Sequence, residues 1–230
     1  LLVVTATSTD DTEGIVSPTI VTFDSTNWML SQNITVTGLN DDVDDADIHF
    51  PVVFTSQLSY VHTDGTANTK AIADMSVEVI NQDDDIAGVY WEQFGNQTDE
   101  AGTITLAFTF RLTSEPIAPV LFGVALSDLT EAAIDTNALE FNASSWNDTR
   151  TVLITGVDDY VQDYLQSYSA ILGLSDSEDL LYKGLRTQLN YTNTDDDVVG
   201  INFMQSNSMT SEGGDPVIIQ VTLNSEPTAA

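Results

Sequence analysis

The chain has no cysteine among its 230 residues. A disulfide framework, a thiolate zinc site and a cysteine nucleophile are therefore excluded. His49 and His62 have no partner at the spacing of a metal site or a catalytic triad, and no serine-hydrolase motif or phosphate-binding loop occurs. Acidic pairs are too common among 36 Asp and Glu residues to point to a glycosidase dyad. The sequence gives no positive reason to predict an enzyme.

Basic residues are also scarce. Five Lys and Arg residues face 36 Asp and Glu residues, which gives a formal net charge of -31. This balance argues against nucleic acid and anionic membrane surfaces as partners and favours cations. No apolar run approaches the length of a membrane span, so no membrane insertion is predicted. The absence of an initiator Met and of a signal peptide leads us to expect a mature chain or an excerpt.

An acidic triplet occurs twice and marks an internal repeat. Asp83-Asp84-Asp85 returns as Asp195-Asp196-Asp197, 112 residues later, and each triplet is followed by an apolar residue, a variable residue, Gly and another apolar residue. Phe23 to Trp28 matches Phe141 to Trp146 at an offset of 118 residues, and Leu112 to Pro116 matches Leu223 to Pro227 at an offset of 111. Such a period is close to the size of one β-sandwich domain.

The repeat predicts the domain organisation. Residues 89–200 form one complete unit, residues 1–88 correspond to the later part of a unit, and residues 201–230 correspond to the opening of a further unit. Because half of a sandwich leaves strand edges unpaired, we expect residues 201–230 to be completed by residues 1–88 of the next copy. Whether the copies are one continuous polypeptide or separate subunits stays open at this point.

Alternating apolar residues predict an all-β chain. Ile104, Leu106, Phe108, Phe110 and Leu112 fall on one face of a strand over 103–112, and Val217 to Leu223 repeats the pattern. About seven short strands per unit, separated by Asp, Ser, Thr and Gly, predict tandem antiparallel β-sandwiches of an Ig-like kind. The run from Ser127 to Leu139 is interpreted as a loop with a turn of helix.

Several motifs together resemble the Calx-beta family, the sandwich domain of sodium/calcium exchangers, the integrin beta-4 subunit and large extracellular tandem-repeat proteins. The motifs are Thr210 to Asp215 before a strand, Leu223 to Pro227 after it, the Phe-x4-Trp spacing, the Thr-Gly turn that runs into acids, and the closing acidic triplet. The likeness covers essentially the whole chain. It implies calcium at one end of each sandwich, and it implies an extracellular or cell-surface location.

The resemblance implies two sets of calcium ligands, which suits a hard cation that takes roughly six to eight oxygens. The complete unit would offer Glu100, Asp128, Asp158, Asp159, Asp163, Asp195, Asp196 and Asp197. The incomplete unit would offer Asp10, Asp41, Asp42, Asp45, Asp83, Asp84 and Asp85, with Glu212 of a neighbouring copy as its glutamate. In the loop before Asp163 the complete unit has one acid fewer than the incomplete one. The alternative for the triplets is a solvated turn between domains.

Five sites match the Asn-x-Ser/Thr pattern of N-linked glycosylation, a mild excess over chance. They are Asn33, Asn96, Asn142, Asn147 and Asn190. For a eukaryotic source, at least two of them are expected to carry glycans.

The sequence thus favours a structural or adhesive glycoprotein of the cell exterior. Its partners would be neighbouring copies of itself, joined head to tail into a rod or filament that calcium stiffens. Two other classes remain open, namely a calcium-responsive binding or regulatory module and a carbohydrate-binding or hydrolytic domain.

Overall fold

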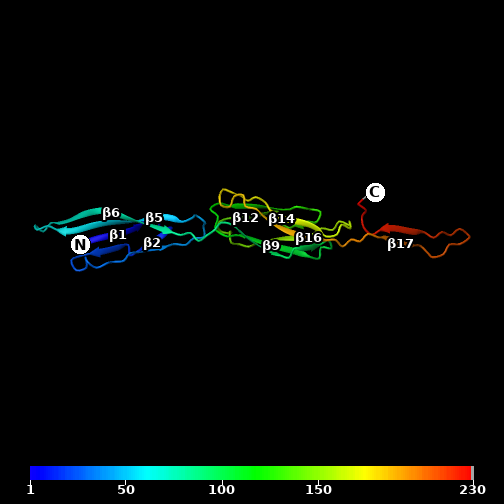
Figure 1. Ribbon diagram of the computed structural model, residues 1–230, viewed down its shortest axis with the longest axis horizontal. Helices are drawn as coiled ribbons and strands as arrows, with labels where there is room; N and C mark the ends of the chain where they lie inside the picture. Colours follow the sequence, from blue (N-terminus) through cyan, green and yellow to red (C-terminus); the bar gives the residue numbers. More distant parts are fainter. Residues whose placement is uncertain (229–230) are drawn as a thin grey trace. The chain divides into compact units, whose positions relative to one another are not determined.

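The computed structural model describes residues 1–228, and this part of the chain is all-β without any helix. The chain forms two compact units, the N-terminal unit Leu1–Ile86 and the C-terminal unit that begins at Ala87 (Figure 1). A search for helices long and apolar enough to cross a membrane finds none among the described residues.

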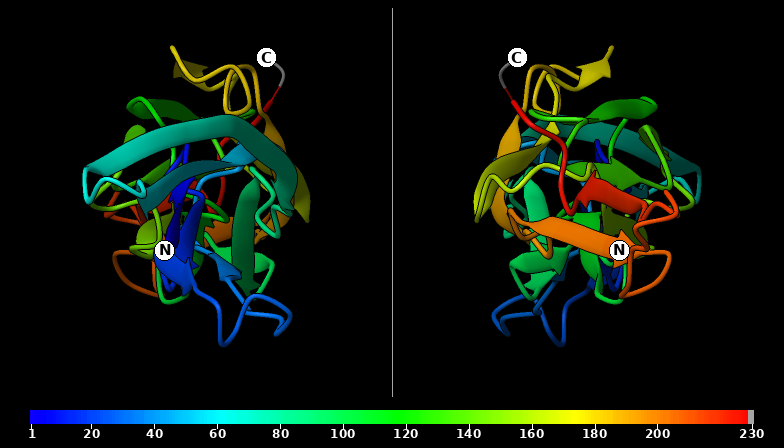
Figure 2. Two further views of the ribbon diagram at one scale, coloured as in Figure 1. Left: turned by 90° about the vertical axis from the view of Figure 1, so that its left-hand side faces the viewer. Right: turned by 90° about the vertical axis from the view of Figure 1, so that its right-hand side faces the viewer.

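The N-terminal unit contains one four-stranded sheet, in the order β3-β1-β5-β6, and one separate strand pair, β2-β4. Its strands are β1 (Leu2–Ser8), β2 (Gly14–Ser17), β3 (Ile20–Phe23), β4 (Thr35–Gly38), β5 (Ile48–Val61) and β6 (Ala67–Asn81). The long β5 and β6 form a curled antiparallel hairpin (Figure 2). The buried core cluster of this unit is small and consists of Ala6, Phe50 and Val52, each at most 2% exposed.

The C-terminal unit contains two larger sheets and one separate strand pair. The sheets follow the orders β12-β10-β14-β16-β8, with β15 beside β10, and β11-β13-β9-β7, and the pair is β17-β18. The strands are β7 (Val89–Phe94), β8 (Gln97–Asp99), β9 (Thr105–Leu112), β10 (Val120–Leu126), β11 (Ala132–Ile134), β12 (Ala138–Phe141), β13 (Arg150–Gly156), β14 (Gln166–Leu172), β15 (Asp176–Ser177), β16 (Thr187–Thr194), β17 (Ile201–Gln205) and β18 (Ile219–Leu223).

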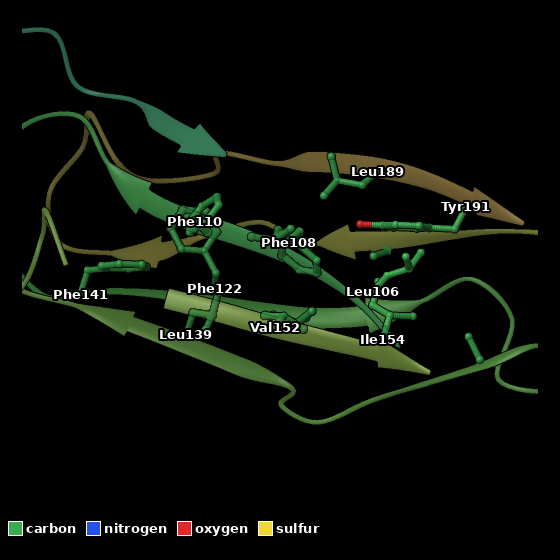
Figure 3. Close-up of a cluster of buried hydrophobic side chains, with 14 of the residues drawn as sticks. Leu106, Phe108, Phe110, Phe122, Leu139, Phe141, Val152, Ile154, Leu189 and Tyr191 are labelled. Atoms are coloured by element: carbon green, nitrogen blue, oxygen red, sulfur yellow. The ribbon is translucent and has the colours of Figure 1, made fainter. Parts of the chain in front are cut away.

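One core lies between the two larger sheets, as in a β-sandwich. Phe110 of β9 packs edge-on against Phe122 of β10, with ring centroids 4.9 Å apart, and Phe141 of β12 completes this aromatic group (Figure 3). The alternation predicted for 103–112 is confirmed for Leu106, Phe108, Phe110 and Leu112, which are all buried. Ile104 was predicted on the same face but is 43% exposed, because β9 begins only at Thr105. Burial of large apolar side chains of this kind supplies most of the stabilisation of such a domain.

The strand pairing inside one unit matches the strand pairing inside the other, as the sequence repeat predicts. The order β3-β1-β5-β6 in the N-terminal unit has the same connectivity as β12-β10-β14-β16, and β2-β4 has that of β11-β13. The register agrees as well, because Val16 lies opposite Val36 and Ile134 lies opposite Ile154. The N-terminal unit has no described counterparts of β7, β8 and β9.

Two local expectations differ from the structure. The 127–139 segment contains the short strand β11 and no turn of helix, because Ala132 and Ile134 extend the edge of the sheet beside β13. The pairing is not wholly antiparallel either, since β8 runs parallel to β16. After β7 has paired with β9 in one sheet, the chain crosses to the other sheet at β8, and this crossing sets the direction of the short strand.

A buried tyrosine fixes the chain after β9. The Tyr182 hydroxyl accepts a hydrogen bond from the Ser114 backbone N–H at 3.0 Å and donates one to the Ser114 carbonyl at 2.7 Å. Tyr182→Phe would leave these buried backbone groups without partners, so we expect a loss of about 2 kcal/mol in the free energy of unfolding. Urea denaturation measures this free energy. The control is Tyr160→Phe, because the Tyr160 side chain is exposed, and its free energy of unfolding is expected to stay within about 0.5 kcal/mol of that of the natural protein. Equal effects of the two changes would contradict the assignment.

Candidate metal centre

Most of the acids singled out in the sequence lie in loops that follow β8, β13 and β16, or in the corresponding loops of the N-terminal unit. Three groups have carboxylate oxygens within 4.8 Å of one another among the described residues. We call them the Glu100 cluster (Glu100, Asp158, Asp196, Asp197), the Glu131 cluster (Glu131, Asp159, Asp163) and the Glu13 cluster (Glu13, Asp41, Asp45).

The Glu100 cluster is built where three strands end. Glu100 directly follows β8, and its backbone N–H donates to the Thr194 carbonyl of β16 at 3.0 Å, which holds it beside the second triplet. The Glu100 side chain is only 3% exposed. Its Oε2 atom and the Oδ2 atom of Asp197 are buried without a hydrogen-bond partner. Buried carboxylate oxygens without partners are costly unless a cation or a proton compensates them.

The electrostatics of this cluster favour such compensation. Burial, together with the charges of Asp195, Asp159 and Asp163, raises the pKa of Glu100 to about 7, although a hydrogen bond from the Asp196 backbone opposes the shift. Burial and the neighbouring charges also raise the pKa of Asp197. Without a cation, Glu100 therefore keeps its proton up to a pH near neutrality, where an ordinary glutamate has already released it.

The Glu131 cluster lies in the same unit and contains a residue that was not predicted. Glu131 is 6% exposed, and the Asn193 side-chain amide donates to its Oε2 at 3.5 Å. Asp163 has its Oδ1 atom buried without a partner. Burial raises the pKa of Glu131 and of Asp163, and nearby acids, Asp159 among them, add to both shifts.

The Glu13 cluster has the corresponding position in the N-terminal unit. Glu13 is 8% exposed and accepts a hydrogen bond from the Asn81 amide at 3.1 Å, as Glu131 does from Asn193. Burial and the charges of Glu13, Asp41 and Asp83 raise the pKa of Asp45. A cavity of about 540 Å³ adjoins this cluster, and Asp83, Asp84 and Asp85 contribute to its lining.

The first acid of each triplet accepts hydrogen bonds from backbone N–H groups. Asp195 accepts from the Tyr164 N–H at 2.7 Å and from the Asp197 N–H at 2.7 Å. Asp83 accepts from the N–H groups of Ala46 and Asp85 at 2.9 and 2.8 Å. Tyr164 and Ala46 both adopt positive φ values, 68° and 67°, so the two turns are alike.

Several predicted ligands lie outside the three groups. Asp128 accepts hydrogen bonds from the backbone and side chain of Thr130, and Asp10 accepts the same pair from Thr12. These side-chain hydrogen bonds lower the pKa of both acids. Asp42, Asp83, Asp84, Asp85, Asp195 and Glu212 also belong to none of the groups. Their role as ligands stays a prediction.

Glu13 and Glu131 carry a sequence signal that the prediction did not use. Both end the pattern Asp-x-Thr-Glu, in Asp10 to Glu13 and Asp128 to Glu131, at the same offset of 118 residues as the other matched blocks. In each copy the Asp and Thr close a turn with each other, and this turn directs the Glu into the unit.

The three groups offer carboxylate oxygens and no nitrogen or sulfur ligand, which is the donor set of calcium and magnesium. The buried oxygens without a partner belong to Glu100 and Asp197 of the Glu100 cluster and to Asp163 of the Glu131 cluster. They fit cation binding by these two clusters of the C-terminal unit.

The five asparagines predicted to carry glycans all have exposed side chains, namely Asn33, Asn96, Asn142, Asn147 and Asn190.

No protein-family model and no curated protein matches this chain.

Proposed function

We propose that this chain is a structural or adhesive repeat protein of the cell exterior, without enzymatic activity, whose Calx-beta-like sandwiches join copy to copy and are stiffened by calcium. One observation carries the proposal. Among the described residues, the N-terminal unit has the strand order of the C-terminal unit without β7, β8 and β9, while β17 and β18 pair only with each other. Each part of the chain therefore offers what the other lacks.

Calcium has a direct physical role in this proposal. A chain with a net charge of -31 repels itself, and the repulsion is largest where acids gather at the ends of the strands. A divalent cation bound by several loops converts this repulsion into a cross-link between them. The unpartnered oxygens of Glu100 and Asp197 support a cation at this end of the unit.

Electron microscopy and light scattering test the function. In calcium, the protein is expected to form linear particles of variable length, which soften or shorten when EDTA removes the metal. Particles of one fixed monomer size in both conditions would contradict the structural role. If such monomers still bound calcium, the regulatory-module alternative would be favoured instead.

Glycan occupancy tests the predicted glycosylation sites independently of assembly. After expression in a secreting eukaryotic cell, at least two of the five exposed asparagines are expected to carry glycans, so that the mass of the intact protein falls on treatment with a peptide-N-glycosidase. A quintuple Asn→Gln variant serves as the control. A secreted wild-type protein whose mass does not change would contradict the prediction.

A further inference from the structure

The N-terminal unit has an open side. Among the described residues, β4 pairs only with β2, and β6 pairs only with β5, so each has one free edge. Gly38, at the end of β4, and Asn81, at the end of β6, both line the cavity of about 540 Å³. Unpaired backbone groups at such edges are ready to accept a further strand.

In the C-terminal unit, β8 fills the corresponding place. Gln97, Thr98 and Asp99 pair with β16, and the Thr98 hydroxyl lies 2.9 Å from Oδ1 of Asn193. A Cβ atom on Gly156 would come within 2.2 Å of the Asp99 carbonyl oxygen, so the backbone of β8 lies directly against this glycine.

The two sites are alike in detail. The Asn193 amide donates to Glu131 and to the Val157 carbonyl, at 3.5 and 3.3 Å. The Asn81 amide donates to Glu13 and to the Leu39 carbonyl, at 3.1 and 2.8 Å. Asn81 and Gly38 therefore present the surface that Asn193 and Gly156 present to β8.

The β17-β18 pair is the counterpart of β7-β9. Ile201 and Phe203 lie opposite Leu223 and Val221, as Val89 and Trp91 lie opposite Leu112 and Phe110. The burial differs sharply, however. Ile219, Val221 and Leu223 are 60%, 56% and 54% exposed, whereas the equivalent Phe108, Phe110 and Leu112 are at most 1% exposed. The strand predicted at 217–223 forms over Ile219–Leu223, and no core among the described residues covers its apolar face.

The equivalent tryptophans Trp146 and Trp28 also differ in burial. Trp146 packs against the core of the C-terminal unit, and its carbonyl accepts a hydrogen bond from the Leu112 N–H of β9 at 3.0 Å. Trp28, its equivalent, is 67% exposed. The residue that corresponds to Leu112 is Leu223 of β18.

We propose that β18 of a second copy pairs with β4 of this unit, that its Thr210 and Ser211 enter the cavity in the positions of Thr98 and Asp99 of β8, and that its Glu212 takes the position of Glu100. This inference rests on the proposed function and adds the register, that is, which residues of β18 lie opposite which residues of β4. Because Val152 lies opposite Phe108 and Leu153 opposite Ala107, Ile34 lies opposite Ile219 and Thr35 opposite Ile218. Thr210 then faces Asn81 as Thr98 faces Asn193.

This register also brings acidic side chains of the two copies together. Glu212 takes the position of Glu100 and so comes beside Asp84 and Asp85, the counterparts of Asp196 and Asp197. Three like charges at one interface oppose docking unless a divalent cation lies among them. Docking of the second copy therefore depends on calcium and completes a cation site that neither copy holds alone.

Engineered cysteines test the register, because the natural chain has none. The double variant Thr35→Cys/Ile218→Cys, oxidised in calcium, is expected to give a ladder of disulfide-linked dimers and larger species on a non-reducing denaturing gel. The control Thr35→Cys/Gln220→Cys moves one cysteine two residues along the same face. Diagonal cross-strand positions lie roughly 7–8 Å apart, beyond ordinary disulfide reach, so its ladder is expected to be at least tenfold weaker.

The outcomes separate this inference from the proposed function. Wild-type assembly in calcium without a stronger ladder for the Thr35/Ile218 pair would overturn the register alone. A cross-linked monomer would mean that the strand docks within its own chain, and would overturn the second copy as the occupant. A chain that stays monomeric with and without calcium would overturn both proposals.

Tryptophan emission provides a second measurement that requires no cysteine. Docking would bury Trp28 against Leu223, so the emission maximum of the wild-type protein is expected to shift to shorter wavelength as its concentration rises in calcium. Trp28→Phe should remove most of this shift, because Trp91 and Trp146 lie in the unit that is already complete. A concentration series without any shift in the wild-type emission would contradict the docking of β18.

Discussion

Saturating calcium is expected to raise the melting temperature of the C-terminal unit by on the order of 10 °C. A ligand that binds only the folded state at 100 times its dissociation constant adds about 2.7 kcal/mol to the free energy of unfolding. For a domain of about 100 residues, each kcal/mol shifts the melting temperature by roughly 4–8 °C. Calorimetry in calcium and in EDTA measures the difference.

Glu100→Gln is the variant that assigns this effect to a site. The change keeps the shape of the side chain but removes a charge from the Glu100 cluster, so we expect most of the calcium-induced rise to be lost. In EDTA the variant should be at least as stable as the natural protein, because repulsion with Asp158 and Asp197 is relieved.

Two controls separate site binding from screening. Glu140→Gln removes the same charge at an exposed position on β12 and should leave the rise intact. Magnesium at equal ionic strength should give a much smaller rise, because it gives up its water less readily for a cage of protein carboxylates. An equal response of Glu100→Gln and the natural protein to calcium would refute the Glu100 cluster as a calcium site.

The all-β character of the fold was predictable from local patterns. The alternation over 103–112 gave β9, and the matched blocks gave the offset that relates β4 to β13. Burial was not predictable in the same way. Val217 to Leu223 carries the same alternation as β9, but whether such a face is covered depends on strands that are distant in the sequence or belong to another copy.

The site shows a different limit of sequence reasoning. Acids in matched loops can be found from the sequence, but the direction of each side chain depends on local hydrogen bonds. Asp128 and Asp195 are held by neighbouring N–H or hydroxyl groups, whereas Glu131, which was not predicted, lies buried in a cluster. A short Asp side chain closes a turn readily, and the longer Glu that follows can reach the interior.

Acidification in the absence of calcium is expected to stabilise the C-terminal unit between about pH 8 and pH 5. The pKa of Glu100 is raised from 4.5 to about 7 in the folded state. Between these values the folded protein binds a proton that the unfolded chain has released, so the free energy of unfolding falls as the pH rises. One pKa unit corresponds to about 1.4 kcal/mol, which limits the contribution of Glu100 to about 3 kcal/mol.

Calcium should reverse this dependence, because the ion competes with the proton for the same carboxylates and binds more tightly as the pH rises. Carboxyls with lowered pKa values, such as Asp99 and Asp128, lose their contribution only below about pH 4, outside this range. Melting temperatures in EDTA at pH 5, 6, 7 and 8 therefore isolate the raised groups. The fall with pH should be clearly smaller in Glu100→Gln, and the other acids of this unit with raised pKa values, Glu131, Asp163 and Asp197, account for the remainder. A natural protein that gained stability in EDTA from pH 5 to pH 8 would show that Glu100 is charged and compensated by something other than a cation or a proton.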